Sequence, residues 1–325
     1  MAKYDHRLVR TWARMGPRAV YGQQLLELAK LDSSVVALSA DLGRSSGLGA
    51  FANQIPERYF NTGIAEQNLV GVSAGLARMG FTPFASTFAP FASLRAGDQV
   101  RMNMGYMQEP VKLVSLASGF ALGFLGNSHF GIEDIAVMRS IPGINIVAPA
   151  DCVEMAECLA TIKDINLPFY VRLTGAPGSP PVFSSDYRFQ FGRAVEVKPL
   201  QPITLVSHGV TVGHALRAVE ELQSEGLSLG LVNMHTIKPL DLSMLKKISR
   251  ACQHLLIFEE HSTVGGLGSA ITDEIQKFEN VSLRIHRFGL RDYFPKAGSY
   301  DYMLKTLGLD SVGIKNSTLK VAKTV

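Results

Sequence analysis

Short apolar runs and longer helical patterns alternate along this 325-residue chain. Apolar runs of four to eight residues between turn signals are typical of buried strands. Alternating strands and helices predict a mostly parallel sheet with helices on both faces. In the first half, the predicted strands are Val35–Leu38, Phe81–Ala85, Val111–Leu116, Ile144–Ala148 and Phe169–Leu173, and the predicted helices are Glu66–Met79, Ser93–Met107 and Asp151–Lys163.

The segment Thr174–Arg188 interrupts this pattern with three prolines, two glycines and three serines, a composition typical of a linker. We therefore expect two doubly wound α/β domains, at residues 1–175 and 190–325, joined by a linker at 176–189. Asp151 with Glu154 fits a capping box, and Asp241 fits a helix N-cap. The strands predicted after the linker lie near Ile203–Val206, Leu229–Val232, Leu255–Phe258 and Ser282–Arg284.

Composition adds little to this picture of a folded α/β protein. With 46% hydrophobic and 18% charged residues, the chain can bury two cores, and its net charge of +4 is dispersed. The densest basic stretch, Lys3–Arg18, is interrupted by apolar residues and predicts a peripheral arm or interface rather than a nucleic-acid site. Cys152, Cys158 and Cys252 form no metal or redox motif, so we expect three reduced core thiols. No run has transmembrane length and no signal peptide is evident, which predicts a soluble cytoplasmic protein.

The segment Asn61–Asn68, with the sequence NTGIAEQN, is the strongest candidate for a functional site. Its carboxylate, Glu66, lies between a strand-like run and a Gly/Ala-rich helix. Ligands of α/β proteins bind where strands lead into helices. An acid in a first helical turn also interacts favourably with the helix dipole without any catalytic role. The octamer alone leaves both interpretations open.

Further segments extend the evidence along the chain. They are Ala40-Asp41-Leu42, Gly63–Gln67, Ala74–Ala77, Ser86-Thr87-Phe88, Asn127-Ser128-His129, Ile141-Pro142-Gly143, His235–Asp241, Glu259-Glu260-His261 and Gly265–Gly268. In order and spacing, the segments from Ala40 to Asp151 resemble the pyrimidine-binding domain of transketolases and the related deoxyxylulose-phosphate synthases. The later segments also match, so the resemblance covers nearly the whole chain. It corresponds to the second half of a full-length transketolase.

The resemblance implies thiamine diphosphate as cofactor. In that family the carboxylate equivalent to Glu66 hydrogen-bonds a ring nitrogen of the aminopyrimidine and favours the tautomer that deprotonates the thiazolium ring. The resemblance places Phe88 as the residue that stacks on the aminopyrimidine, with Phe91 and Ile64 in the same cofactor site. Two aromatic residues three positions apart are otherwise typical of ordinary core packing.

The resemblance also assigns residues to the substrate. His129, in the glycine-rich segment Gly119–Gly131, matches the histidine that contacts the substrate carbonyl and hydroxyls, and so has a catalytic role. Arg18, Ser45 and Arg172 match residues that hold the distal phosphate of the sugar. Without the resemblance, a lone loop histidine suggests a structural role, and an arginine at a strand end suggests a surface charge.

Two positions depart from the family pattern. Ala117 replaces a histidine of the phosphate site, and Leu125 replaces an acidic residue. Both changes make the site more apolar, so the donor, the acceptor or the terminal oxyanion is expected to be unusual.

The chain also lacks the Gly-Asp-Gly segment through which the family binds Mg²⁺ and the diphosphate. The nearest sequence, Gly97-Asp98-Gln99, lies within a helical pattern. We therefore predict no metal site in this chain. A separate N-terminal, diphosphate-binding subunit is expected to supply Mg²⁺ ligation, in an α2β2 assembly.

The leading hypothesis is a transketolase subunit that transfers a two-carbon ketol unit from a ketose, expected to be phosphorylated, to an aldose. One alternative is a subunit similar to deoxyxylulose-phosphate synthase or to the β chain of 2-oxoacid dehydrogenases, which would require a decarboxylating donor such as pyruvate. Another is a catalytically silent scaffold, which the presence of Glu66, Phe88 and His129 together argues against.

Overall fold

The computed structural model describes residues 4–184 and 186–323. Lys3 of the predicted basic stretch and Ser185 of the predicted linker lie outside the described residues. The first half contains α1 (His6–Met15), α2 (Pro17–Leu31), β1 (Val35–Ser39), α3 (Gly49–Gln54), η1 (Pro56–Arg58), β2 (Tyr59–Asn61), α4 (Glu66–Arg78), β3 (Thr82–Phe88), η2 (Phe91–Arg95), α5 (Gly97–Gln99), η3 (Val100–Tyr106), β4 (Lys112–Leu116), η4 (Gly123–Leu125), α6 (Asp134–Ser140), β5 (Asn145–Val147), α7 (Cys152–Ile162) and β6 (Phe169–Arg172).

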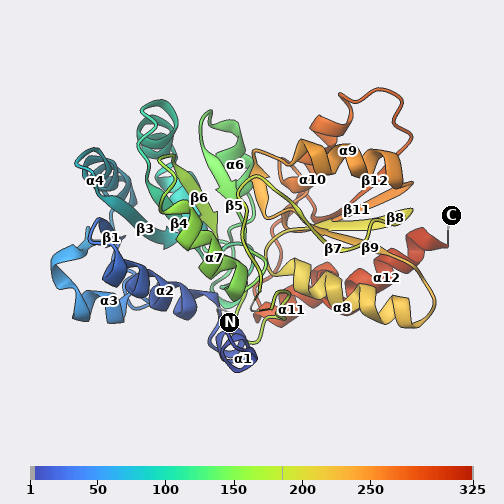
Figure 1. Ribbon diagram of the computed structural model, residues 1–325, viewed down its shortest axis with the longest axis horizontal. Coiled ribbons are helices and arrows are strands. Elements are labelled where there is room, and N and C mark those ends of the chain that lie inside the picture. The colour runs from blue at the N-terminus through green and yellow to red at the C-terminus, as the bar shows by residue number, and fades with distance from the viewer. Residues whose placement is uncertain (1–3, 185, 324–325) are drawn as a thin grey trace.

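The second half repeats the alternation of strands and helices. It contains β7 (Val195–Lys198), β8 (Ile203–Ser207), α8 (Thr211–Ser224), β9 (Gly230–Asn233), β10 (Thr236–Lys238), α9 (Leu242–Ala251), β11 (His254–Ser262), α10 (Leu267–Ile275), β12 (Arg284–Leu290), α11 (Tyr300–Leu307) and α12 (Ser311–Ala322). Figure 1 shows the two halves as two lobes, with α1 below the region where they meet. Within the described residues, no helix is long and apolar enough to cross a membrane.

Each lobe is built on one mostly parallel sheet. The first sheet has the order β10-β5-β6-β4-β3-β1-β2, and the second has the order β12-β11-β8-β9-β7. All pairs are parallel except β10 with β5 and β7 with β9. The predicted α/β fold class is therefore confirmed. The strand β10 belongs to the second half of the chain but pairs with β5 of the first sheet, so the two lobes share a strand pairing. The domain boundaries at residues 175 and 190 stay a prediction.

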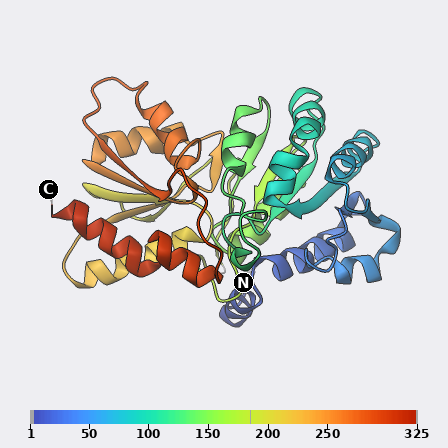
Figure 2. The same cartoon turned by 180° about the vertical axis from the view of Figure 1, so that it is seen from behind.

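Three apolar clusters fill the spaces between these layers. One packs α1, α2, α3 and α7 against one face of the first sheet. A second joins α4, η3 and α6 on the opposite face with α9 and α10 of the second lobe, so this core is continuous across both sheets. A third covers the other face of the second sheet with α8, α11 and α12, and Figure 2 shows α12 along that face. The three cysteines are free and buried, as predicted.

Most predicted elements coincide with observed ones to within a few residues. Asp151 caps α7 by accepting from the Glu154 amide, but the Glu154 carboxylate accepts from the amide of Ala150, one residue before the position that a capping box requires. Asp241 caps α9 as predicted. The helix predicted at Ser93–Met107 is two wide π-type segments, η2 and η3, flanking α5.

Candidate active site

The predicted site residues follow the carboxyl ends of neighbouring parallel strands. Glu66 comes after β2, Ser45 after β1, Phe88 ends β3 and His129 lies in the loop after β4. The four strands β4, β3, β1 and β2 are neighbours in the sheet and run parallel. These residues therefore lie along the side of the sheet where the carboxyl ends of the strands meet. The topology thus brings together residues that are up to 84 positions apart in the sequence.

Glu66 is the first residue of α4 and is only 2% exposed. Gly63 makes the turn before it with φ +72°, a conformation that glycine adopts without strain. The N-terminal end of the helix favours the negative charge, as the dipole interpretation predicted. Burial shows in addition that Glu66 is not a solvated surface acid. The neighbouring Ile64 is 77% exposed, although large apolar side chains are usually buried.

Arg95, which the sequence analysis did not single out, contacts the Glu66 carboxylate. Its Nη1 lies 3.0 Å from one oxygen of Glu66 and 3.1 Å from the other. The same guanidinium lies 4.1 Å from the centre of the Phe91 ring, within the range of a cation–π contact. Arg95 stands four residues after Phe91 in a helical pattern, and this spacing was the signal that could have found it.

Three rings lie beside this ion pair. The centre of Phe91 is 6.1 Å from that of Phe88 and 5.4 Å from the imidazole of His129, which contacts both phenylalanines edge-on. Such tilted arrangements are favourable for aromatic pairs. The Nδ1 atom of His129 lies 3.0 Å from the Ser128 hydroxyl, which leaves Nε2 for a ligand. The structure therefore groups a buried carboxylate, an arginine, two phenylalanines and a histidine.

Arg18 and Ser45 line a shared hollow of about 440 Å³. Arg18 Nη1 lies 3.4 Å from the backbone oxygen of Ser45. Arg44, not identified from the sequence, lines the same hollow. Two guanidinium groups beside a hydroxyl group suit a phosphate or another tetrahedral oxyanion.

The contact of Arg172 with substrate stays a prediction, and the structure shows this residue in a buried network of contacts within the protein. Its side chain is fully buried, and its Nε lies 2.9 Å from the carboxylate of Asp134, which is equally buried. Its Nη2 donates to the backbone oxygens of Gly131 and Glu260. The guanidinium is therefore part of the junction between the two lobes. The sequence motif located a strand end correctly but gave no sign of the buried partner 38 residues away.

The two positions that depart from the family pattern lie in different environments. Ala117 is buried at the end of β4 with φ +51°, an unusual conformation for a residue with a Cβ atom. Leu125 is partly exposed in η4. In residues 4–184 and 186–323, no group of three or more His, Cys, Asp or Glu side chains is placed to hold a metal ion.

Two family models match most of the chain. The family model of the transketolase pyrimidine-binding domain matches residues 14–175, and that of the transketolase C-terminal domain matches residues 192–314. The chain belongs to the transketolase family. A solved split-gene transketolase, described as an inactive beta4 tetramer, is 36% identical, with a TM-score of 0.83 over 94% of this chain and 97% of that one.

Several relatives match this chain over nearly their whole length. A putative transketolase C-terminal section of Methanocaldococcus jannaschii is 36% identical over 95% of this chain and 96% of the relative. The 6-deoxy-6-sulfo-D-fructose transketolase subunit SqwH of Clostridium sp. (strain MSTE9) is 34% identical over 94% of each. One of the apulose-4-phosphate transketolase subunits of Phocaeicola vulgatus is 34% identical over 94% of this chain and 97% of the relative. The predicted transketolase-type subunit is thereby confirmed.

The family implies thiamine diphosphate, and the residues present fit its pyrimidine half. A buried carboxylate at a helix start, Glu66, can accept from a protonated ring nitrogen, and the Phe88 and Phe91 rings provide apolar surfaces for a heterocycle. In the structure, Arg95 takes the place of such a donor to Glu66.

Proposed function

We propose that this chain is the pyrimidine-binding and C-terminal subunit of a two-chain transketolase that transfers a two-carbon ketol unit from a ketose to an aldose. The observation that carries the proposal is the buried Glu66 carboxylate, which Arg95 contacts, together with the packing of Arg95 on Phe91 and of Phe91 against His129. A scaffold subunit has no need for a desolvated carboxylate at a helix start in a cluster that also contains an arginine, two phenylalanines and a histidine. Family membership supports the reaction class.

Within this proposal, thiamine diphosphate supplies a carbon nucleophile next to the substrate carbonyl. Glu66 would accept a hydrogen bond from the aminopyrimidine and hold a proton at that contact. Phe88, Phe91 and Ile64 would offer apolar surfaces to the ring of the cofactor and exclude water from it. His129 donates from Nε2 to the carbonyl oxygen as negative charge develops on it.

We propose that the hollow lined by Arg18, Arg44 and Ser45 binds the terminal oxyanion of the sugar. The relatives named for a sulfonated and a phosphorylated sugar both act on substrates with such an end. A tetrahedral oxyanion matches two guanidinium groups and a hydroxyl group in shape and charge.

A separate subunit completes the site in this proposal. It supplies the Mg²⁺ ligands through the Gly-Asp-Gly segment that this chain lacks, in an α2β2 assembly. The relative described as inactive consists of beta chains, which supports the need for a second subunit. The exposed Ile64 beside Glu66 supports contact with that subunit and the cofactor.

The test is reconstitution. This chain is combined with the diphosphate-binding subunit from the same cells, thiamine diphosphate and Mg²⁺, and ketol transfer is measured with a panel of phosphorylated and sulfonated ketoses. Native mass spectrometry reports the stoichiometry of the complex. We expect activity from the complex and none from this chain alone.

Glu66→Gln is the decisive variant, and Glu57→Gln, an exposed acid of η1, is its matched control. We expect Glu66→Gln to assemble normally and to lose at least about a hundredfold in kcat, the scale of general acid–base catalysis. Full activity of Glu66→Gln would contradict the proposal. Turnover that requires pyruvate and releases carbon dioxide would favour the synthase-like or dehydrogenase-like alternative instead.

A further inference from the structure

The loop that carries His129 is closed at its base. The Gly119 amide donates to the Gly131 oxygen at 2.8 Å, and the Gly131 amide donates back to Gly119 at 2.9 Å. Residues 119–131, called here the His129 loop, are therefore one closed unit after β4. Whatever holds its two ends fixes the position of the imidazole.

Glu260, on β11 of the second sheet, holds the first end. One oxygen of its buried carboxylate accepts from the Phe120 amide at 2.6 Å. The other accepts from the Tyr300 hydroxyl at 2.9 Å, which ties the same carboxylate to α11. No side chain fits at Gly119 in this arrangement, because a Cβ atom there would overlap the carboxylate of Glu260.

The second end of the loop, at Gly131, is attached to Glu260 through Arg172. The Nη2 of Arg172 donates both to the Gly131 oxygen and to the backbone oxygen of Glu260, each at 2.9 Å. Asp134, at the start of α6, fixes the guanidinium in turn. Both ends of the loop thus depend on one position of the second sheet.

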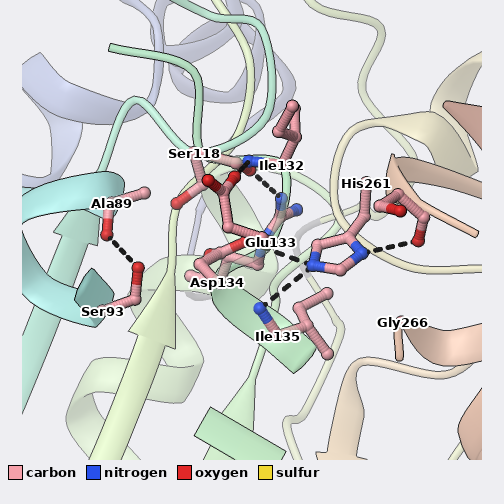
Figure 3. Close-up of polar contacts among 12 residues, drawn as sticks. Ala89, Ser93, Ser118, Ile132, Glu133, Asp134, Ile135, His261 and Gly266 are labelled. Atoms are coloured by element: carbon pink, nitrogen blue, oxygen red, sulfur yellow. Dashed lines mark hydrogen bonds and ion pairs between the residues drawn. The ribbon is translucent and has the colours of Figure 1, made fainter. Parts of the chain in front are cut away.

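A neighbouring histidine completes the junction without adding charge. Figure 3 shows the ring of His261 pointing from β11 toward Asp134 and Ile135. Its Nε2 accepts from the Ile135 amide at 3.2 Å, and its Nδ1 contacts the Ser262 oxygen at 2.7 Å. Burial lowers the pKa of His261 to about 4, so the ring is neutral near pH 7.

Apolar contacts also attach the loop to the second lobe. The rings of Phe120 and Phe130 are buried, 5.3 Å apart, in the cluster that includes Phe258 and Met303. The Gly298 amide donates to the Gly123 oxygen at 3.1 Å. The His129 loop is therefore connected in sequence to the first sheet but is packed largely on the second.

We propose that Glu260 is a positioning residue for His129, through which the C-terminal lobe sets the geometry of the active-site loop. The Glu260 carboxylate clamps Phe120 to β11 and α11, and its backbone oxygen anchors Gly131 through Arg172. Without the clamp, the base of the loop loosens and His129 is no longer held against Phe91. The kinetic consequence rests on the proposed function, whereas the loosening of the loop does not.

The adjacent Glu259 provides a matched control. It is also fully buried on β11, but its carboxylate accepts from the Leu267 and Gly268 amides at the start of α10, within the second lobe. Burial raises the pKa of both carboxyl groups to about 7. The two residues therefore differ in the backbone that they hold rather than in burial or charge.

Hydrogen–deuterium exchange on the isolated chain tests the clamp directly. We expect Glu260→Ala to raise amide exchange in residues 119–131 by about tenfold, the scale of a lost charge-assisted hydrogen bond. Glu259→Ala should raise exchange in α10 and leave residues 119–131 unchanged. If Glu260→Ala does not fold, Tyr300→Phe removes a single donor to the carboxylate and is expected to raise the same exchange to a smaller extent.

Kinetics of the reconstituted complex test the consequence for His129. Glu260→Ala should lower kcat about tenfold or more with unchanged thiamine diphosphate affinity, and Glu260→Gln, which keeps an acceptor for Phe120, should restore most of it. A folded Glu260→Ala with unchanged exchange in residues 119–131 would overturn the inference. If the exchange changes but the wild-type complex shows no ketol transfer, the clamp stands and the proposed function fails.

Discussion

Arg95 donates from a single guanidinium nitrogen to both carboxylate oxygens of Glu66, at 3.0 and 3.1 Å. The two side chains differ in burial, since that of Arg95 is 44% exposed and that of Glu66 is 3% exposed. Arg95 also packs on Phe91. The arginine therefore compensates a buried negative charge at the surface where the cofactor is expected to bind.

Arg95→Ala should destabilise the isolated chain, because it leaves the buried Glu66 carboxylate without its cation. We expect a loss of about 1–2 kcal/mol in the free energy of unfolding, less than for a fully buried pair. In a Glu66→Gln background the same substitution should cost less, and urea denaturation of the four proteins measures this coupling. Arg101→Ala, which removes a pair with an exposed Asp98 at 3.8 Å, is the control. Equal costs in both backgrounds would contradict the prediction.

Glu154 on α7 gives a prediction about pH. Its carboxylate accepts from the Asn233 amide of the second lobe, and burial raises its pKa to about 7. The folded chain therefore retains a proton in a range where the unfolded chain has released it. This contribution to stability is full below the unfolded pKa and is lost as the pH rises toward about 7.

We expect wild type to lose about 1–3 kcal/mol of unfolding free energy relative to Glu154→Gln between about pH 4.5 and about pH 8. Urea denaturation of both proteins at several pH values measures the difference. Wild type has to be compared with Glu154→Gln because buried histidines change stability with pH in the opposite direction. Burial lowers the pKa of His235 to about 4, so the contribution of this histidine to stability rises with pH. A difference between the two proteins that does not vary with pH would rule the prediction out.

Elements with a strong local signal could be predicted from the sequence. The strand β1 is a mostly apolar run that begins with two valines and is buried at every position, which makes its pattern unambiguous. The strand predicted near Ser282–Arg284 instead overlaps β12, Arg284–Leu290, only at its first residue, because this edge strand mixes basic and apolar side chains and is largely half-exposed. Nothing local indicates that β10 joins the first sheet, since that pairing depends on how the two lobes pack.

In the site, too, local motifs could be predicted from the sequence, whereas contacts between the two lobes could not. Glu66, Phe88 and His129 stand in short motifs, and the strand order alone brings the ends of β2, β3 and β4 together. In the sequence, Glu260 stood out only as part of the segment Glu259-Glu260-His261, which resembles the family but implied no role for this residue. Its bond to Phe120 spans 140 residues, and two carboxylates within a buried strand were the available signal.

Arg172 is expected to be a stability residue, in contrast to its predicted contact with substrate. Arg172→Met leaves the buried Asp134 carboxylate uncompensated and should cost about 3–5 kcal/mol in unfolding free energy. The double variant Arg172→Met/Asp134→Leu should recover part of this loss, since no buried charge remains. Thermal and urea denaturation measure both effects. A stable Arg172→Met with a raised KM for phosphorylated sugars would instead support the predicted contact of Arg172 with substrate.

Arg18 and Arg44 should instead affect substrate binding. Both line the hollow with Ser45, so Arg18→Ala and Arg44→Ala should each raise KM for a ketose with a terminal oxyanion by about ten- to a hundredfold, the cost of a charge-assisted contact. For a ketose without that oxyanion, KM should change little, which makes the ratio of the two KM values the measurement. Arg14→Ala, in the last turn of α1, is the control. Equal effects on both sugars would place the oxyanion site elsewhere.

A substitution at Ile64 distinguishes a structural role from a cofactor-binding role, because its side chain is 77% exposed in this chain. An exposed apolar residue contributes little to stability, so Ile64→Ala should leave the unfolding free energy within about 0.5 kcal/mol of wild type. If Ile64 packs against bound thiamine diphosphate, the same variant should weaken cofactor affinity of the reconstituted complex by about tenfold, the scale of one buried aliphatic contact. Leu31→Ala is the control, since Leu31 is 86% exposed at the end of α2. Equal cofactor affinity in the two variants would remove Ile64 from the cofactor site, while weaker subunit association in Ile64→Ala would assign it to the interface.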